Sequence, residues 1–124
     1  MFQQRIVIIS INDVLYDRAI NTIITYPAAK TNDKFIIPGS ITTIGNAAFM
    51  GSYLGQVTIP DSVTSIGSEA FSSCSLMTEV NIGSGIESIE DNTFNGCSSL
   101  EVIDIPHNVR KDWRQCFFGL YVIN

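Results

Sequence analysis

The sequence is poor in charge, and in positive charge above all. Charged residues make up 15% of the 124 positions, and 7 Lys and Arg stand against 12 Asp and Glu, for a net charge of −5. Without a basic patch we expect neither nucleic acid nor an anionic membrane as a partner, whereas small cationic or polar partners stay open. Hydrophobic residues supply 45% of the chain, a composition that argues against disorder and predicts one folded domain.

The sequence also lacks the residues of most catalytic and metal sites. It has one histidine and three cysteines, with no Cys-x-x-Cys, no paired Cys/His spacing and no phosphate-binding loop. His107 has no nucleophile motif beside it. Three acidic residues, Glu79, Glu101 and Asp104, gather by repeat register, but an open sheet face offers no cleft for paired acid chemistry. We therefore predict no enzyme, no metal site and no cofactor.

Long apolar runs are absent. After Arg5 a short stretch over 6–9 is interrupted by Ser10, Asn12 and Asp13, so no export signal is visible, and no run reaches the roughly 18 apolar residues of a membrane span. We expect no membrane insertion. If Met1 is the native start, the sequence favours a cytoplasmic protein. If the chain is part of a longer exported protein, it favours the cell surface or secretion.

What the sequence has in abundance is repetition. Three segments are copies of one sequence repeat: "FIIPGSITTIGNAAF" (35–49), "VTIPDSVTSIGSEAF" (57–71) and "VNIGSGIESIEDNTF" (80–94). Two landmarks recur in register with steps of 22, 23 and 23 residues, and such self-similarity indicates a stacked repeat architecture. The landmarks are Pro38, Pro60, Gly83 and Pro106, and Phe49, Phe71, Phe94 and Phe117.

Each unit predicts a short strand that ends at the proline position. Alternating apolar residues precede that position, and proline stops strand pairing because it has no N–H. A second inward pair follows, such as Val63 and Ile66, then a glycine turn and a short helical or irregular segment around Phe71. Nineteen isoleucines against five leucines suit strands. Stacked about 4.8 Å apart, such units bury one another's apolar faces, so we predict a β-rich solenoid with Ile59, Ile82 and Ile105 on neighbouring parallel strands.

The repeat resembles the BspA-type leucine-rich repeat, whose pattern is I-P-x-S-V-T-x-I-G-x-x-A-F-x-x-C. "IPDSVTSIGSEAF" followed by "SSC" carries the likeness, which spans about 35–105, and "DVLYDRAINTIITYPAAKTNDKFIIP" (13–38) is similar to a hairpin found in such proteins. The resemblance implies a right-handed coil of parallel strands and a non-catalytic binding or adhesion protein of the surface of bacteria or some mucosal protists. It carries over no functional residues. The third repeat departs from the pattern at Gly83, Glu90 and Thr93, where we expect a different turn geometry.

The ends of a solenoid expose core and need covering. We predict one repeat domain, 1–124, with an N-terminal hairpin cap over 1–34, repeats over 35–105 and a C-terminal cap over 106–124. The hairpin strands are 14–16 and 22–26. An apolar stripe over 109–120 predicts an amphipathic helix that closes the coil or docks a partner, and the tail "YVIN" could pair as an edge strand.

Two cysteines, Cys74 and Cys97, occupy the same position in successive repeats. Strand spacing brings their Cα atoms within disulfide range, but a ladder of parallel side chains does not guarantee the torsion. Buried core thiols are the better interpretation.

The outward positions of the strands are the predicted binding surface, because repeat proteins commonly bind through equivalent variable positions. The alternative is that these polar residues are simply solvated. Two hypotheses for function follow: a module that binds an unidentified protein partner through this face, or a structural spacer or homodimer formed through edge strands or the C-terminal helix. The predicted rows are Ile36, Thr58, Asn81 and Asp104, then Gln56, Glu79 and Val102, with Glu101 in a third position after Gly55 and Thr78.

Overall fold

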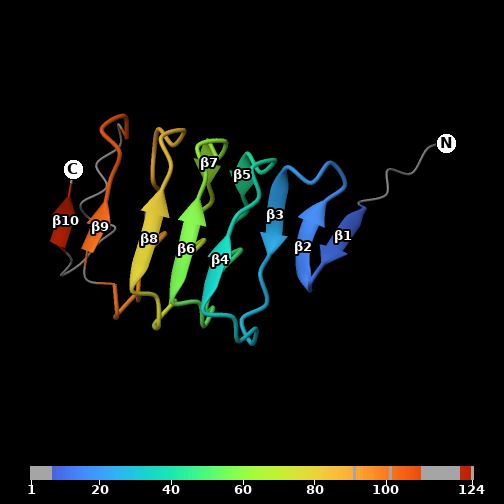
Figure 1. The fold of residues 1–124 in the computed structure, drawn as a ribbon, viewed down its shortest axis with the longest axis horizontal. Helices are drawn as coiled ribbons and strands as arrows, with labels where there is room; N and C mark the ends of the chain where they lie inside the picture. Colours follow the sequence, from blue (N-terminus) through green and yellow to red (C-terminus); the bar gives the residue numbers. More distant parts are fainter. Residues whose placement is uncertain (1–6, 91, 101, 110–120, 124) are drawn as a thin grey trace.

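The computed structural model describes residues 7–90, 92–100, 102–109 and 121–123, and within these residues it contains ten strands and no helix. The chain winds as a β-solenoid of about four turns, each of which we call a rung. Figure 1 shows the strands side by side along the long axis, with the N-terminus at one end and the C-terminus at the other. The predicted solenoid is confirmed.

One side of the coil is a sheet of parallel strands, which we call sheet B. Its order is β10-β9-β8-β6-β4, and each pair of neighbouring strands in it is parallel. Ile59 of β6 pairs with Ile82 of β8 as predicted, and Asn81 pairs with Asp104 of β9, while Ile105 is the residue directly after β9. The strands are β4 (Lys34–Ile36), β6 (Gln56–Ile59), β8 (Glu79–Ile82), β9 (Val102–Asp104) and β10 (Tyr121–Ile123).

The other side, sheet A, joins the N-terminal hairpin to the second short strand of each unit. Its order is β1-β2-β3-β5-β7. The predicted hairpin is confirmed as an antiparallel pair, β2 with β3, and β3 then pairs in parallel with β5, so the hairpin extends the sheet rather than only covering its end. The strands are β1 (Ile8–Ile11), β2 (Val14–Asp17), β3 (Thr22–Thr25), β5 (Thr43–Ile44) and β7 (Ser65–Ile66).

Strand β1 was not predicted. It pairs antiparallel with β2 through a two-residue turn at Asn12 and Asp13, whose φ angles are 49° and 70°. Asparagine and aspartate tolerate this left-handed conformation better than most residues, and such turns suit the twist of a hairpin. The polar residues that interrupt the apolar run therefore close a hairpin.

The core consists of apolar rows that repeat from rung to rung. Val57, Ile59 and Ile105 are at most 1% exposed, while Ile82 is partly buried and packs against the core. At the back of the coil lies an aromatic stack, defined as Tyr26, Phe49, Phe71 and Phe94, whose successive ring centroids are 5.2, 4.8 and 5.4 Å apart. Tyr26 thus continues the phenylalanine row into the hairpin. The segment around Phe71 is turns, not helix.

Backbone hydrogen bonds tie each rung to the next. The Gly55 N–H donates to the Asp33 carbonyl and the Thr78 N–H donates to the Gly55 carbonyl, both at 2.8 Å. At the back, the Phe49 N–H donates to the Ala70 carbonyl at 2.7 Å. Polar groups on both sides of the coil are therefore satisfied by neighbouring rungs, as buried backbone requires.

The third rung shows why its sequence departs from the pattern. A Cβ at Gly83 would lie 2.5 Å from the Pro60 carbonyl carbon, and one at Gly85 would lie 2.1 Å from the Asp61 carbonyl oxygen. These glycines let the third rung approach the second closely, where a side chain would collide. The Ser84 N–H also donates to the Asp61 carboxylate at 2.8 Å.

The predicted C-terminal helix falls on residues 110–120, with Cys116 and Phe117 among them, and lies outside the described residues. The tail after it does pair as an edge strand: β10 lies parallel to β9, with Val122 opposite Ile103. Val109, just before the helix stretch, is partly buried against the core.

Candidate functional site

The outward residues of sheet B form the predicted rows. Ile36 pairs with Thr58, Thr58 with Asn81, and Asn81 with Asp104, which we call the outward row. Parallel strands lie about 4.8 Å apart, so its side chains line up across the coil. In the second row Lys34 pairs with Gln56, and Gln56 pairs with Glu79. Val102 is the equivalent residue of β9, two positions before Asp104. Glu101 lies outside the described residues.

Exposure to solvent changes along both rows, from β6 to the later strands. Glu79, Asn81 and Asp104 are exposed, whereas Gln56 and Thr58 are half-buried. Ile36 is 74% exposed, the largest value among the exposed large hydrophobic residues of the described chain. A single exposed isoleucine is ordinary on a protein surface. As the first member of an otherwise polar row, however, Ile36 gives the N-terminal end of the sheet B face an apolar contact point.

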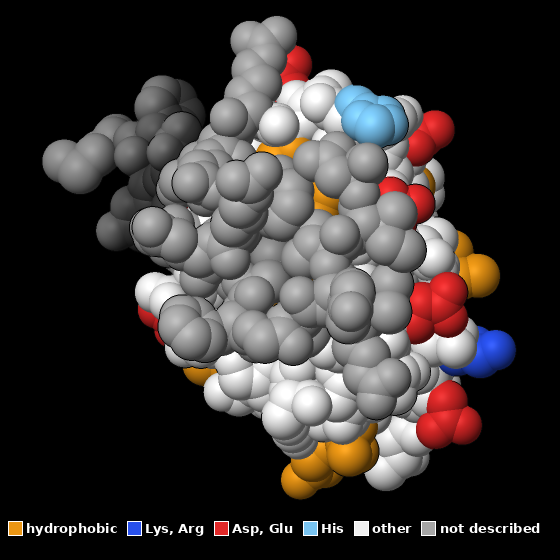
Figure 2. All heavy atoms as spheres, turned by 90° about the vertical axis from the view of Figure 1, so that its left-hand side faces the viewer, with side chains coloured by type: hydrophobic (Ala, Val, Ile, Leu, Met, Phe, Trp, Pro, Cys, Tyr) orange, Lys and Arg blue, Asp and Glu red, His pale blue; other side chains and the backbone are white. Residues whose placement is uncertain are grey.

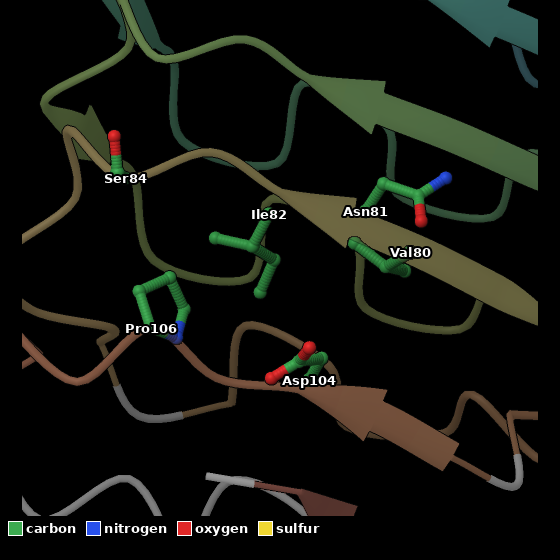
Figure 3. A pocket seen from close by; sticks show the side chains of 6 residues that line it. All are labelled: Val80, Asn81, Ile82, Ser84, Asp104 and Pro106. Atoms are coloured by element: carbon green, nitrogen blue, oxygen red, sulfur yellow. The ribbon is translucent and has the colours of Figure 1, made fainter.

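A shallow hollow runs between β8 and β9 near their carboxyl ends. It has a volume of about 290 Å³ and is lined by Val80, Asn81, Ile82, Ser84, Asp104 and Pro106. Figure 3 shows Ile82 and Pro106 on neighbouring segments of the hollow, with the Asp104 side chain on β9. Ile82 and Ser84, on either side of Gly83, both line the hollow. Ile82 is half-buried there, whereas Ile59 and Ile105 are 1% exposed.

A second hollow of about 330 Å³ adjoins the first and shares Val80, Asn81 and Asp104 with it. Its other lining residues are Thr78 and Glu79. Together the two hollows form a groove, which we call the β8–β9 groove, with apolar lining from Ile82 and Pro106 and carboxylates from Glu79 and Asp104.

The groove is acidic. Within the described residues, neither Glu79 nor Asp104 forms an ion pair or a side-chain hydrogen bond, so both carboxylates are available. Figure 2 views the molecule from its C-terminal side, and acidic side chains gather along its right-hand edge, where the near face of Figure 1 now lies. A surface of this sign attracts cationic groups and raises their local concentration.

The described residues give no support to metal chemistry, since they hold no group of three or more His, Cys, Asp or Glu placed to bind a metal ion. Cys74 and Cys97 are free thiols in the core, which confirms the interpretation as buried thiols. The Cys74 thiol donates to the Phe49 carbonyl at 3.0 Å and the Cys97 thiol to the Phe71 carbonyl at 3.1 Å. The pKa of Cys74 is raised by its hydrogen bond with Cys97 and by burial, so it stays protonated and unreactive.

Sequence reasoning placed the rows but missed the groove. The sequence carried no signal for it, because the lining residues come from β8 and β9 and meet only in the folded coil. Lys34 was also missed as the first member of the second row, although its distance of 22 residues from Gln56 is one repeat. No helix among the described residues has the length and apolarity to cross a membrane.

Comparisons with known proteins follow the repeat closely. A family profile described as "BspA type Leucine rich repeat region (6 copies)" matches residues 25–124. No curated protein matches the chain.

Several solved structures share the fold. A leucine rich cell surface protein from Faecalibacterium prausnitzii is 36% identical, with a TM-score of 0.79, and the match covers 82% of this chain and 28% of that one. The pneumococcal vaccine antigen PcpA is 25% identical, with a TM-score of 0.80, over 82% of this chain and 25% of that one. A leucine-rich repeat protein from Bacteroides capillosus is 24% identical, with a TM-score of 0.79, over 94% of this chain and 99% of that one. The chain thus spans about a quarter of the first two.

Proposed function

The chain belongs to the BspA-type leucine-rich repeat family, and from that premise we propose that it is a non-catalytic module that binds a protein partner through the outward face of sheet B. The family match covers the repeats that build this face. The face is a regular array of parallel strands whose outward side chains differ from rung to rung. Arrays of this kind serve as extended binding surfaces in repeat proteins.

The observation that carries the proposal is the pair of unpaired carboxylates beside an apolar groove. Glu79 and Asp104 flank the β8–β9 groove, whose apolar lining includes Ile82 and Pro106. A lysine or arginine of a partner can meet the carboxylates while its alkyl stem covers the apolar wall, because these side chains combine an apolar stem with a charged head. The proposed partner therefore presents a basic surface.

The relatives support a place at the cell surface. The Faecalibacterium prausnitzii protein is described as a leucine rich cell surface protein. We extend that location to this chain as part of the proposal, with adhesion to a host or neighbouring cell as the setting.

The test reverses the charge of the groove. Glu79→Lys and Asp104→Lys, singly and together, are compared with the wild type for capture of proteins from host-cell surface extracts. Each captured protein is then purified and titrated against the same variants by surface plasmon resonance. We expect the double variant to weaken binding at least about 100-fold, since a like-charge contact costs several kcal/mol.

Glu87→Lys is the matched control. It makes the same charge change at an exposed residue that lies outside the strands of sheet B. Binding that survives Glu87→Lys but not Asp104→Lys supports the proposal. Equal losses in both would reduce the effect to net charge and reject the groove as the site.

A second candidate function, self-association, is favoured by strand β1. This strand is the outermost in sheet A, and Val7, Ile8 and Ile11 are 42%, 49% and 45% exposed. An apolar edge strand with free backbone groups is a template for pairing with another chain. A homodimer joined at β1 would make the protein a structural unit with no dedicated ligand.

Sedimentation velocity over a range of protein concentrations separates the two candidates. Self-association at β1 predicts a concentration-dependent dimer that Ile8→Lys abolishes while Glu79→Lys leaves it intact. A monomer at every concentration removes this second candidate.

A further inference from the structure

One turn at the back of the coil holds a chemically reactive pair of residues. Asn95-Gly96 is the single Asn-Gly pair of the chain, and it directly follows Phe94 of the aromatic stack. The turn favours this glycine, because Gly96 has a φ of 80° and an added Cβ would lie 3.3 Å from the Ser73 Cα. An asparagine before glycine readily loses its side-chain amide, since glycine has no side chain to hinder attack by its own backbone nitrogen.

Both reacting groups of the pair are exposed, and within the described residues neither the Asn95 side-chain amide nor the Gly96 N–H forms a hydrogen bond. The equivalent N–H groups of the two earlier rungs are both engaged. The Gly51 N–H donates to the Ser72 carbonyl at 2.9 Å. The Ser73 N–H donates to the Asn95 carbonyl at 2.7 Å. Among these three rungs, the backbone nitrogen is therefore available for attack only at Gly96.

The second rung assists the loss of the proton from this nitrogen. Two donors meet the carbonyl oxygen of the peptide group between Asn95 and Gly96: the Ser73 N–H at 2.7 Å and the Ser72 hydroxyl at 3.2 Å. When the Gly96 nitrogen loses its proton, the negative charge is shared with that oxygen, because nitrogen and carbonyl are conjugated. Hydrogen-bond donors placed where charge develops stabilise it. The contact between rungs therefore favours the reactive form of the nitrogen.

We propose that Asn95 is a site of spontaneous deamidation, assisted by the two donors of the second rung and with water as the only reagent. The Gly96 nitrogen gives its proton to solvent and attacks the Asn95 Cγ. The side-chain nitrogen takes up a proton and leaves as ammonia, and a succinimide ring closes. Water then opens the ring to aspartate or to isoaspartate, in which the main chain runs through Cγ and the former backbone carbonyl becomes a free carboxylate. The site is independent of the β8–β9 groove and of any partner bound there.

Isoaspartate changes the third rung. It adds one carbon to the main chain between Phe94 and Cys97, which are 2% and 6% exposed. It also removes from the main chain the carbonyl that accepts hydrogen bonds from the second rung. A short turn held between two buried side chains cannot take up an extra atom unless one of them shifts, because the core is close-packed. We therefore expect chains that carry isoaspartate to be less stable.

Incubation of the purified full chain at body temperature tests the proposal, with peptide mapping by mass spectrometry as the measurement. We expect Asn95 to lose its amide at least about tenfold faster than Asn46, whose side chain accepts a hydrogen bond from the Ser68 N–H that attack must break. The rate is expected to rise with pH, because the attacking nitrogen must lose its proton. Methyl transfer by an isoaspartate-specific carboxyl methyltransferase is expected to detect isoaspartate in the same samples. Deamidation of Asn95 no faster than that of Asn46 would overturn the proposal.

Substitutions assign the roles. Asn95→Ser copies the residue at the equivalent position of the second rung, Ser72, and is expected to abolish isoaspartate. Ser72→Ala keeps the Asn-Gly pair but removes one donor, and is expected to slow deamidation about three- to tenfold. Ser98→Ala is the matched control, at an exposed serine whose hydroxyl makes no hydrogen bond within the described residues. A rate in Ser72→Ala equal to or above that of the wild type would overturn the assistance by the second rung.

Thermal melts provide a second readout. The isoaspartate fraction, separated by anion exchange, is expected to melt roughly 5 °C below the fresh wild type. Freshly purified Asn95→Asp carries the same added charge on an ordinary main chain, and is expected to melt within about 2 °C of the wild type. If the isoaspartate fraction and Asn95→Asp melt at the same temperature, the effect is one of charge and the proposed change in the third rung is overturned.

Discussion

The aromatic stack and the outward row cross the same rungs, yet their chemistry differs completely. The stack repeats one kind of side chain, and its four members are at most 2% exposed. The outward row has isoleucine, threonine, asparagine and aspartate at equivalent positions. Close packing restricts the shape of a buried side chain, whereas solvent accepts any polar one. The difference teaches that the repeat fixes the coil and leaves the outward row free for recognition.

The largest loss of stability is expected when a ring is removed from the middle of the aromatic stack. Phe71 is fully buried between Phe49 and Phe94, so Phe71→Ala is expected to cost about 3–5 kcal/mol of unfolding free energy, measured by urea denaturation. Tyr53→Ala, at a tyrosine that is 55% exposed, is the control. Equal effects of the two changes would mean that the stack does not support the coil.

Adding a methyl group between two rungs is expected to give the next largest loss of stability. Gly85→Ala would place a Cβ 2.1 Å from the Asp61 carbonyl oxygen, so the backbone must shift, and we expect a loss of about 1–3 kcal/mol. Gly39→Ala meets nothing within 4 Å and is the matched control, with a change of about 0.5 kcal/mol or less. Urea denaturation of both variants provides the measurement. A neutral Gly85→Ala would contradict the close approach of the two rungs.

Asn108 links the last described rung to the one before it. Its side-chain amide donates to the carbonyls of Ser84 at 2.7 Å and Ile86 at 2.9 Å. Asn108→Ala is expected to cost about 1 kcal/mol, because both hydrogen bonds are lost but the carbonyls can be reached by water. The exposed neighbour His107→Ala serves as the reference in the same thermal melts. No difference between them would count against a structural role for the asparagine.

The smallest effect on stability is expected on the outward row. Asn81→Ala removes an exposed side chain that has no hydrogen bond within the described residues, so stability is expected to change by no more than about 0.5 kcal/mol. Affinity for a partner captured through the β8–β9 groove is expected to fall in the same variant. Thermal melts and surface plasmon resonance on one preparation check both. A larger loss of stability than in Asn108→Ala would remove the distinction between the two regions.

The repeat made most of the coil predictable. The steps between Pro38, Pro60 and Pro106 placed the parallel strands in the observed register, and the positions of Ile59 and Ile105 identified buried rows. This succeeds because one repeat cannot bury its apolar face alone, so the period dictates which residues meet. The resemblance to the family added the hairpin, which the structure confirms as β2 and β3.

The missed features depend on tertiary contacts that no period records. Strand β1 is an exposed apolar strand outside the repeat, and only the Asn12–Asp13 turn indicated it. A hollow beside the hairpin is lined by Asp13, Tyr26, Lys30 and Phe35, and their meeting follows from the docking of the hairpin. The β8–β9 groove is lined by residues of two successive rungs, and their spacing appears only once both strands are placed.

The hydrogen bonds from each rung to the next have a consequence for how the protein opens. Because a rung, in the part of the chain that the structure describes, exchanges backbone hydrogen bonds and ring contacts only with adjacent rungs, the coil can unfold from its termini one turn after another without first melting its middle. Amide hydrogen exchange should therefore be slowest at β6 and β8 and faster toward β1, a gradient that a uniformly protected globule would lack. A chain built in this way also accepts further turns at either terminus, since each added turn needs only the surface of the one beneath it.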